Sequence, residues 1–471
     1  GSGGGAVTSK YGIASGYAST TYGYGWGAGG WGLSAWGLGG AVPVSLQQRD
    51  WWFDNFDNDL VMNIRNGAIY YWQRGTLATP ETSLATPAVL LSGLTIDGVA
   101  PVDVPNRAMQ TLVSQNDKHL LAFGCQPYAG SSTDFDPLLI RWASQNQPNV
   151  WNPLVTNTAG FLRVARGSQI VRAIPTKQEI LVFTEATLNS LQFLGTVEVF
   201  GLQELSHEIT IAGPNAVTAA NNIVFWMGLN KFYLYSGRVD TLPCTLRQFI
   251  FDDINQTQSQ LIIAGTNNQF SEVIWFYCTA DSNEIDRYVI YNYADNIWYY
   301  GDLSRTAWID SSIISNPVAA SSGWLYKHED GVDDGQPGGT NLPITSWIQS
   351  ADIDIDDGDK YMLIRRIIPD VNFNGSETTN PVTGATIVPE ALITVGVRNF
   401  PGAASSTTNL EGQTTEADIV TASATIDQYT NQVFIRARGR QMNFKISSDT
   451  VGSQWQLGMP RVDARPDGRR N

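Results

Sequence analysis

The feature that most constrains the fold is a long series of short segments rich in Val, Ile, Tyr, Phe and Trp. Each segment is bounded by Gly, Asn, Asp or Pro, and the series begins near residue 46. Short runs of β-branched and aromatic residues between turn-forming residues predict β-strands. Helical periodicity is sparse, and the one fair helical candidate is the stretch 246–255. The sequence therefore predicts an all-β chain.

The strands fall into a loose repeat of about 40 to 50 residues, and an aromatic residue closes each unit. The closing aromatics are Trp72, Trp151, Phe193, Tyr235, Trp298 and Tyr326. Short turns between the strands, without intervening helices, favour a propeller over a solenoid. We expect residues 46–335 to form a β-propeller-like domain of six or seven blades. The dipeptide Asn66–Gly67 predicts a hairpin with a type I′ turn.

A softer break occurs at the acidic, glycine-rich stretch 329–339. The strands that follow are longer and are separated by long polar loops, which predicts a β-sandwich-like domain over residues 336–460. Residues 461–471 are interpreted as a basic tail on an acidic chain. The arginines of this tail are Arg461, Arg465, Arg469 and Arg470.

The first 45 residues form an extended Gly/aromatic arm that differs from the rest of the chain. Glycine leaves the backbone flexible and costs entropy to order, whereas aromatic side chains supply large contact areas. This combination suits an assembly arm that orders against other chains. The alternative is a disordered tail, although free tails are usually poor in aromatic residues. The candidate interface residues of the arm are Tyr22, Tyr24, Trp26, Trp31 and Trp36, to which we add the four arginines of the tail.

The charge content is low and acidic. Charged residues make up 15% of the chain and its formal net charge is −15, whereas about 25% charged residues is typical. Proteins that hold nucleic acid tightly are usually basic, so this chain is a poor DNA clamp. An acidic wall could line a channel through which DNA slides without sticking. A surface poor in charge suits a chain embedded among neighbours, and the alternative is a monomer with a neutral polar surface.

Motifs for catalysis, cofactors or metals are missing from the sequence. The chain has three cysteines and three histidines, which are Cys125, Cys244, Cys278, His119, His207 and His328. Their spacing gives neither a disulfide framework nor a zinc site, and no P-loop, dinucleotide fingerprint or serine elbow occurs. We predict a non-enzyme without catalytic residues, cofactor or metal. No apolar run is long enough for a membrane-spanning helix.

Two acidic stretches have competing interpretations. The run Asp352–Asp359 resembles the start of a calcium loop, but the glycine and the final glutamate of an EF-hand are missing, and a strand with a charged outer face is favoured. The patch Trp51–Asp59 places aromatics beside three carboxylates, as in sugar-binding sites. A structural turn is the favoured interpretation of this second stretch.

Three pieces of the chain resemble tail nozzle or tail hub proteins of short-tailed, podovirus-type bacteriophages. They are TYGYGWGAGGWG followed by WWFDNFDNDLVMNIRNGAIYYW, then HLLAFGCQPYAGSSTDFDPLLIRWASQNQPNVWNP, and finally RARGRQMNFKISSDTVGSQWQLGMPRVDARPDGRR. Each piece is a loose pattern of aromatics and turns. The chain also begins at Gly1, so either a segment has been removed or the numbering begins within a longer product.

The resemblance implies a structural protein of the virion tail. In that family six copies form a ring around the DNA exit channel, bind portal or adaptor proteins, and carry fibres or spikes. DNA would pass through without specific binding, and no membrane span is expected. The first alternative is a carbohydrate-binding tail fibre or receptor-binding module. The second is a propeller glycosidase, which requires two buried carboxylates at the propeller centre.

Overall fold

A computed structural model describes most of the chain after residue 49. The described ranges are 50–74, 87–131, 133–311, 313–336, 340–355, 360–379, 384–399, 407–408, 414–415 and 419–468. The chain divides into two compact units, Gly1–His328 and Glu329–Asn471. The predicted arm residues Tyr22, Tyr24, Trp26, Trp31 and Trp36 lie outside the described residues, as do Arg469 and Arg470.

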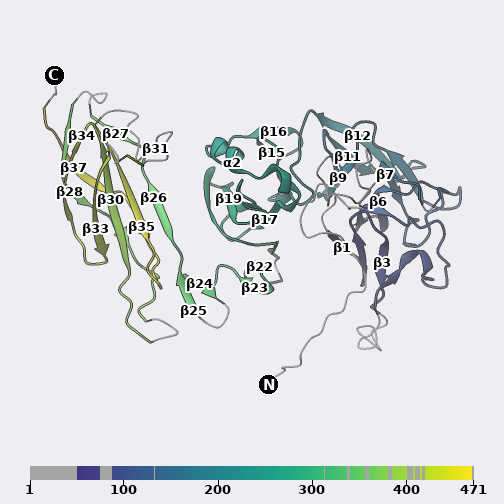
Figure 1. The fold of residues 1–471 in the computed structure, drawn as a ribbon. Helices are drawn as coiled ribbons and strands as arrows, with labels where there is room; N and C mark the ends of the chain where they lie inside the picture. Colours follow the sequence, from purple (N-terminus) through teal and green to yellow (C-terminus); the bar gives the residue numbers. More distant parts are fainter. Residues whose placement is uncertain are drawn as a thin grey trace, which may run out of the picture. The chain divides into compact units, whose positions relative to one another are not determined.

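The described part of the first unit consists of antiparallel sheets that follow one another along the chain (Figure 1). Five sheets have four strands and a sixth has three. The strands are β1 (Trp51–Phe56), β2 (Asp59–Ile64), β3 (Ile69–Trp72), β4 (Val89–Leu90), β5 (Ala108–Ser114), β6 (His119–Cys125), β7 (Asp136–Trp142), β8 (Gly160–Arg163), β9 (Ile170–Pro175), β10 (Ile180–Thr184), β11 (Thr187–Phe193), β12 (Phe200–His207), β13 (Val217–Ala220), β14 (Ile223–Met227), β15 (Phe232–Tyr235), β16 (Val239–Leu242), β17 (Ile263–Asn267), β18 (Glu272–Tyr277), β19 (Arg287–Asn292), β20 (Ile297–Asp302), β21 (Ala307–Ile309), β22 (Val318–Ser321) and β23 (Trp324–Lys327).

Strands within each sheet are ordered as they occur in the chain. The first strands of successive sheets contact one another, as β1 with β5, β5 with β9, β13 with β17 and β17 with β21. This is the arrangement of propeller blades. The predicted all-β chain with a propeller-like body is therefore confirmed. The six closing aromatics fall one to each sheet, although Trp151 lies in the connection between β7 and β8.

The helical prediction is also confirmed, because α2 (Arg247–Asp253) lies within the stretch 246–255. Two short 3-10 turns, η1 (Leu91–Gly93) and η2 (Gln256–Leu261), complete the unit's described helical segments. The predicted hairpin at Asn66–Gly67 joins β2 to β3. Its turn is not of type I′, because Asn66 has a φ of 59° whereas Gly67 is not among the residues with positive φ.

Aromatic side chains fill the space between the blades. Every residue of β18 is buried, since neighbouring sheets cover both of its faces. Trp226 stacks on Tyr233 with ring centroids 5.1 Å apart. Burial of apolar surface contributes roughly 25 cal/mol per Å². Burial of these aromatic side chains therefore stabilises the unit.

The second unit is a β-sandwich (Figure 1). One sheet has the order β26-β35-β30-β33, with β27 also paired to β35, and the other has the order β34-β28-β37. The strands of the unit are β24 (Asp333–Gln336), β25 (Thr340–Pro343), β26 (Ser346–Gln349), β27 (Ile353–Asp354), β28 (Met362–Ile368), β29 (Val371–Asn372), β30 (Glu390–Arg398), β31 (Thr407–Thr408), β32 (Thr414–Thr415), β33 (Ile419–Asp427), β34 (Val433–Gly439), β35 (Gln441–Ser448), β36 (Gln456–Leu457) and β37 (Arg461–Pro466).

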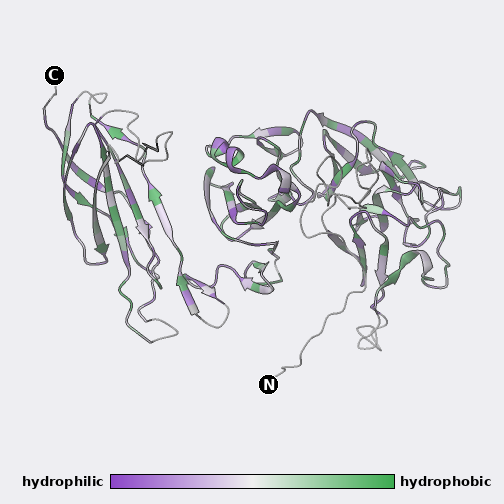
Figure 2. Ribbon diagram, in the orientation of Figure 1, coloured by the Kyte–Doolittle hydropathy of each residue, from purple (hydrophilic) through white to green (hydrophobic). Residues whose placement is uncertain are grey.

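The core of the sandwich lies between its two sheets. Ile364 of β28 and Ile393 of β30 are both fully buried and belong to one apolar cluster. Buried and exposed residues alternate throughout β34, and the first half of β30 alternates between buried and more exposed residues; the strands of this unit carry hydrophobic and hydrophilic residues together (Figure 2). Alternation with a period of two places one set of side chains in the core and the other on the outside. The outward-facing residues of each strand therefore determine the composition of the two outer faces.

The limits of this unit differ from the predicted ones at both ends. The division falls after His328, before the predicted boundary at residue 335. The sequence predicts a basic tail over 461–471, whereas Arg461–Pro466 form the strand β37, which pairs with β28. The reason is that Val462 and Ala464 alternate with charged residues and pack against the core. The segment is thus an amphipathic strand.

The three cysteines are free, with Cys125 and Cys278 buried and Cys244 half-buried. Burial raises the pKa of Cys125 and of Cys278 to about 12, so both behave as small apolar side chains. Across the residues that the structure describes, no helix has the length and apolar character needed to cross a membrane.

Candidate docking surface on the C-terminal sheet

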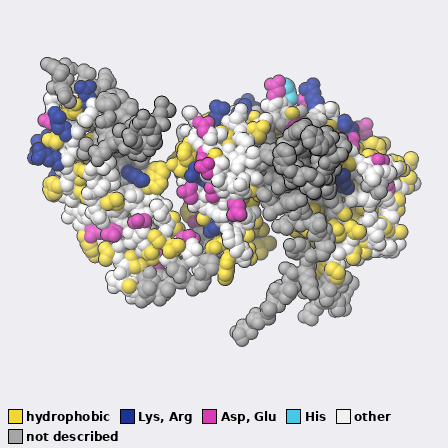
Figure 3. Space-filling view, viewed as in Figure 1, with side chains coloured by type: hydrophobic (Ala, Val, Ile, Leu, Met, Phe, Trp, Pro, Cys, Tyr) yellow, Lys and Arg dark blue, Asp and Glu magenta, His cyan; other side chains and the backbone are white. Residues whose placement is uncertain are grey.

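The outer face of the sheet β34-β28-β37 is rich in arginine. We call it the arginine face, and its arginines are Arg365, Arg366, Arg436, Arg438, Arg461 and Arg465. Figure 3 shows dark blue side chains gathered over β28 and β37. These six residues come from a chain that has only 29 Lys and Arg in all and a net charge of −15. The concentration of positive charge is therefore a local property of this face.

Strand alternation explains why the arginines share one face. In β34 the side chains of Val433, Ile435 and Ala437 enter the core, whereas Arg436 and Arg438 are exposed. The pairing register places Arg438 and Arg465 on either side of Leu363. Side chains that are directly opposite on neighbouring strands lie on the same face, roughly 5 Å apart.

A β-bulge adds a further arginine to the face. The register shifts between Ile364 and Arg366 in both pairings of β28. Opposite β37 the extra residue is Arg365, because Ile364 and Arg366 pair with the consecutive residues Ala464 and Asp463, and Arg365 is exposed. A bulge re-aims side chains locally, so two consecutive arginines both lie outside the core.

Some of these arginines are held by neighbouring groups. Nε of Arg438 lies 2.5 Å from a carboxylate oxygen of Asp467, and its guanidinium lies 4.3 Å from the ring centroid of Tyr361. Nη1 of Arg366 donates to the side chain of Gln432 at 3.2 Å. Arg465 lies 3.5 Å from Asp463. These contacts orient the guanidinium groups at the surface.

The remaining arginines have no such partners. Within the described ranges, the side chains of Arg365, Arg436 and Arg461 make no hydrogen bond and no ion pair, and all three are exposed. Two carboxylates, Asp463 and Asp467, oppose six arginines, which leaves an excess of four positive charges (6 − 2 = 4). Like charges about 7 Å apart repel by about 0.6 kcal/mol even in water. An anionic surface placed on this face would relieve that repulsion.

An exposed aromatic side chain lies among the arginines. Phe434 is 75% exposed and pairs across the sheet with Arg366. Leu363 and Ile368 of β28 are half-buried on the same face. Exposed aromatics surrounded by arginine are enriched at the centres of protein interfaces. The composition of the face is therefore that of a docking surface.

Arg461 and Arg465, which were predicted as interface residues, both belong to the arginine face. Arg365, Arg366, Arg436 and Arg438 were not predicted from the sequence. A signal for β34 was present, because the segment VFIRARG alternates small or apolar residues with Phe and Arg. Which strands would pair with β34 was not visible in the sequence.

The aromatic and acidic patch Trp51–Asp59 is used by the fold. Trp52 is buried, and its Nε1 donates to the carbonyl of Met109 at 2.9 Å. Asp54 accepts from the backbone N–H of Val113 at 2.7 Å, and Asp59 accepts from the hydroxyl of Tyr71 at 2.9 Å. The carboxylates are directed to separate structural contacts. This geometry favours the structural interpretation of the patch.

A charged cluster joins the first, third and fourth sheets. Asp50 accepts two hydrogen bonds of 3.0 Å from Asn215, and Arg65 donates to the carbonyl of Val171 at 3.0 Å. Burial raises the pKa of Asp50 despite its hydrogen bonds to Asn215, and burial lowers the pKa of Arg65 and of Arg172 to about 10. Among the described carboxylates, Asp50 is the one whose charge acts on both arginines. The cluster ties blades together and lacks the carboxylate pair of a glycosidase.

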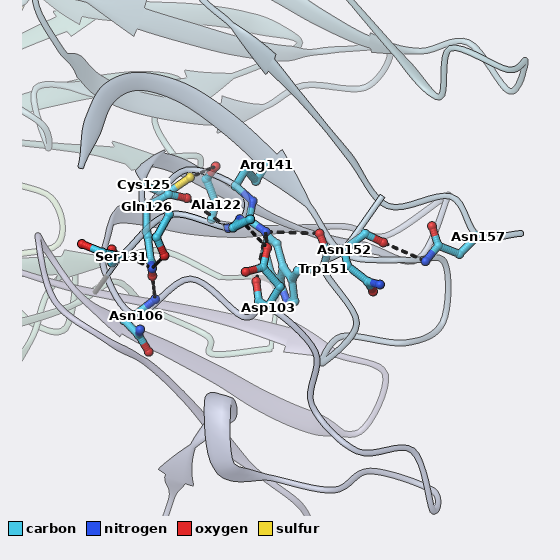
Figure 4. A network of polar contacts seen from close by, with 12 residues as sticks. Asp103, Asn106, Ala122, Cys125, Gln126, Ser131, Arg141, Trp151, Asn152 and Asn157 are labelled. Atoms are coloured by element: carbon cyan, nitrogen blue, oxygen red, sulfur yellow. Dashed lines mark hydrogen bonds and ion pairs between the residues drawn. The ribbon is translucent and has the colours of Figure 1, made fainter. Parts of the chain in front are cut away.

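Arg141 of β7 forms a second buried network (Figure 4). Its guanidinium donates to the carbonyls of Gln126, Trp151 and Asp103 at 3.0, 3.2 and 3.0 Å, and it pairs with the Asp103 carboxylate at 2.5 Å. The network holds the loops around the second sheet. The described residues contain no cluster of three or more His, Cys, Asp or Glu that could hold a metal ion.

Comparisons with known proteins give only distant similarities. No protein-family model matches the chain, and no curated protein matches its sequence. Among solved structures, the extracellular domain of BT4673 from B. thetaiotaomicron has 9% identity and a TM-score of 0.34, and the match covers 59% of this chain and 32% of that one. This chain thus spans about a third of that structure's length.

Two further similarities are equally remote. The N-terminal domain of Nup159 has 9% identity and a TM-score of 0.36, with 60% of this chain and 74% of that chain covered. Hsv2 of Kluyveromyces lactis has 11% identity and a TM-score of 0.33, with 71% of this chain and 95% of that chain covered. Such values carry no argument about function. The propeller-like arrangement is established here by the sheets themselves.

Proposed function

We propose that the chain is a structural protein of a virion tail, resembling the nozzle or hub subunit of short-tailed bacteriophages. In this proposal several copies form a closed ring around the DNA exit channel, with six copies implied by the resemblance. Portal or adaptor proteins and tail fibres or spikes bind to the ring. The ring serves as a passage and a mounting point, and the chain performs no chemistry.

The observation that carries the proposal is the arginine face. Three of its arginines have no ion-pair partner within the described residues, and Phe434 is 75% exposed beside them. A face with this composition costs stability in an isolated chain and gains it when a complementary surface covers it. This is the property expected of a subunit that functions inside an assembly.

The proposal assigns the arginine face to protein contacts and keeps it out of the DNA channel. DNA that must slide needs a wall that does not bind phosphate, because each Lys or Arg contact to a phosphate adds affinity. The net charge of −15 provides enough Asp and Glu for such a wall. The residues facing DNA are therefore expected to be acidic or neutral.

Electron microscopy of the purified chain, and of particles that contain it, tests the proposal. We expect a closed ring in solution and the same ring at a capsid vertex, located with an antibody against the chain. A chain that stays monomeric at all concentrations and is absent from particles would overturn the proposal. Binding of the isolated chain to a glycan array, lost in Trp51→Ala, would instead favour the carbohydrate-binding alternative.

A further inference from the structure

We infer that the arginine face of one copy docks onto an acidic surface of the first unit of a second copy. The acidic surface surrounds α2 and the end of the fifth sheet, and we call it the acidic patch. This inference rests on the proposed ring, and it specifies which two surfaces join neighbouring subunits.

The acidic patch contains six carboxylates and two arginines, Arg247 and Arg287. The carboxylates are Asp252, Asp253, Asp281, Glu284, Asp286 and Asp302. Arg287 pairs with Asp253 and, at 3.0 Å, with Asp302. Figure 3 shows Asp and Glu side chains gathered in the region of α2 and β19. Two positive charges, Arg247 at the start of α2 and Arg287, face six negative ones, so the patch is anionic.

Hydrogen bonds hold the loop 279–286 beside α2. The side chain of Asn255 donates to the carbonyl of Ser282 at 2.8 Å, and its backbone N–H donates to the carbonyl of Cys278 at 2.9 Å. Leu303 donates its backbone N–H to Asp286 at 3.0 Å. Segments far apart in the sequence therefore present their carboxylates as one preformed surface.

The free charges of the two surfaces match. In the described part of the chain, the side chains of Asp252, Asp281 and Glu284 have no hydrogen-bond or ion-pair partner, and all three are exposed. The arginine face likewise has three exposed arginines without partners. Complementary charge directs association and fixes the orientation of the partners. A second copy thus supplies the charges that the arginine face lacks.

Both surfaces also contain an exposed aromatic ring. Phe249 of α2 is 40% exposed, and its ring centroid lies 4.5 Å from that of Tyr300. Phe434 occupies the comparable place on the arginine face. Aromatic rings that pack together at the centre of an interface, with charges around them, are the usual source of affinity. This apolar component favours a protein surface over a nucleic acid as the occupant.

The two surfaces are different and belong to different compact units of the chain. A contact between unlike surfaces is heterologous, so each copy keeps one free surface of each kind after it binds. Repetition of such a contact closes a ring when the rotation between copies permits it. The inference therefore explains how one kind of contact can build the proposed ring.

A capping experiment on the full chain tests the inference. One variant, Arg436→Ser with Arg461→Ser, neutralises the arginine face. Another, Asp281→Asn with Glu284→Gln, neutralises the acidic patch. We expect each variant alone to self-associate at least tenfold more weakly than the unaltered chain in sedimentation velocity. A one-to-one mixture should form dimers and nothing larger, because each dimer then exposes only the two neutralised surfaces.

Two matched variants control for net charge. Arg166→Ser with Arg238→Ser removes two exposed arginines of the first unit, whose side chains are 65% and 82% exposed. Asp97→Asn with Glu198→Gln removes two exposed carboxylates. Both variants should assemble like the unaltered chain, because neither changes the arginine face or the acidic patch.

Three outcomes would overturn the inference. The first is that either neutralised variant self-associates as strongly as the unaltered chain. The second is that the mixture of the two variants remains monomeric. The third is that the arginine-face variant loses binding to duplex DNA while it still self-associates. Particles whose rings form normally from the neutralised variants would refute this inference alone. Absence of the chain from particles would refute the proposed function, whereas dimers in the mixture would still identify the contact.

Discussion

The two outer faces of the C-terminal sandwich share a core and a strand pattern, but they differ in charge. The face of β30, β33 and β35 presents mainly hydroxyl and amide groups together with Leu392 and Lys445; the hydroxyl and amide residues are Thr394, Thr421, Ser423, Thr425, Asn443 and Ser447. On that face the hydroxyls of Thr394 and Ser423 lie 2.9 Å apart. The opposite face presents six arginines. Hydroxyl groups are satisfied by water and by one another, whereas crowded arginines repel.

The arginine face is the one whose composition suits a partner. The hydroxyl groups of the first face cost nothing in an isolated chain, because water replaces any partner. The arginine face carries unpaired charges and an exposed Phe434, which reduce the stability of the isolated unit. Unpaired charges and an exposed aromatic ring that lower the stability of an isolated unit are expected where a bound partner restores that stability.

Reversing the charge of two arginines should reveal the largest difference between the two faces in their effect on self-association. We expect Arg436→Glu with Arg461→Glu to weaken self-association by about a hundredfold, because like charges across an interface cost several kcal/mol. The matched variant Thr421→Glu with Thr425→Glu, on the other face, should change it less than about twofold. Sedimentation equilibrium gives both constants. Equal weakening by the two variants would remove the distinction between the faces.

Removing the aromatic anchor should have the next largest effect. Phe434→Ala is expected to weaken self-association by about thirtyfold, as loss of a hot-spot aromatic does. Tyr429→Ala is the matched control, since Tyr429 is also 75% exposed but lies in the turn before β34. Isothermal dilution calorimetry measures both. If the tyrosine variant lost as much affinity, exposed aromatic area in general would explain the effect.

Salt should weaken the association through the arginine face. Raising the salt concentration from about 0.05 M to 0.5 M is expected to reduce affinity by about tenfold, because the screening length falls below the spacing of exposed charges. The same change should leave the residual association of Arg436→Ser with Arg461→Ser nearly constant. An affinity that does not respond to salt would show that apolar contacts alone join the copies.

The smallest expected effect is on stability. Arg436→Thr should raise the local unfolding free energy of the monomer by about 0.5 kcal/mol, because it removes repulsion between neighbouring arginines. Thr425→Arg on the hydroxyl-rich face should change it by less. Amide hydrogen exchange at Ile364, in the central strand β28, reports this local stability. A loss of stability in Arg436→Thr would mean that the arginine is a structural residue.

Much of the fold could be predicted from local sequence signals. Closing aromatics marked one unit for each of the six sheets, and the stretch 246–255 contained the helix α2. The acidic stretch 329–339 lies at the division between the two units, although the boundary predicted at residue 335 falls later than the division after His328. These predictions succeeded because turn residues and strand periodicity act over a few neighbouring residues.

The arginine face could be predicted only in part. Arg461 and Arg465 were visible as a cluster of charge in the sequence, but the same charge suggested a solvated tail. The pairing of β28 with both β34 and β37 brings Arg366 beside Phe434 and Asp463. Those residues are distant in the sequence, and no local signal specifies which strands become neighbours.

The sequence by itself determined that the chain is built of strands, and it determined which residues of each strand share a side. The tertiary structure alone decided that three strands with arginines on the same side lie next to one another, and that a bulge at Arg365 adds one more. The physical reason is that alternation is a property of a single strand, whereas strand order depends on burying Val462, Ala464 and the rest of the core together.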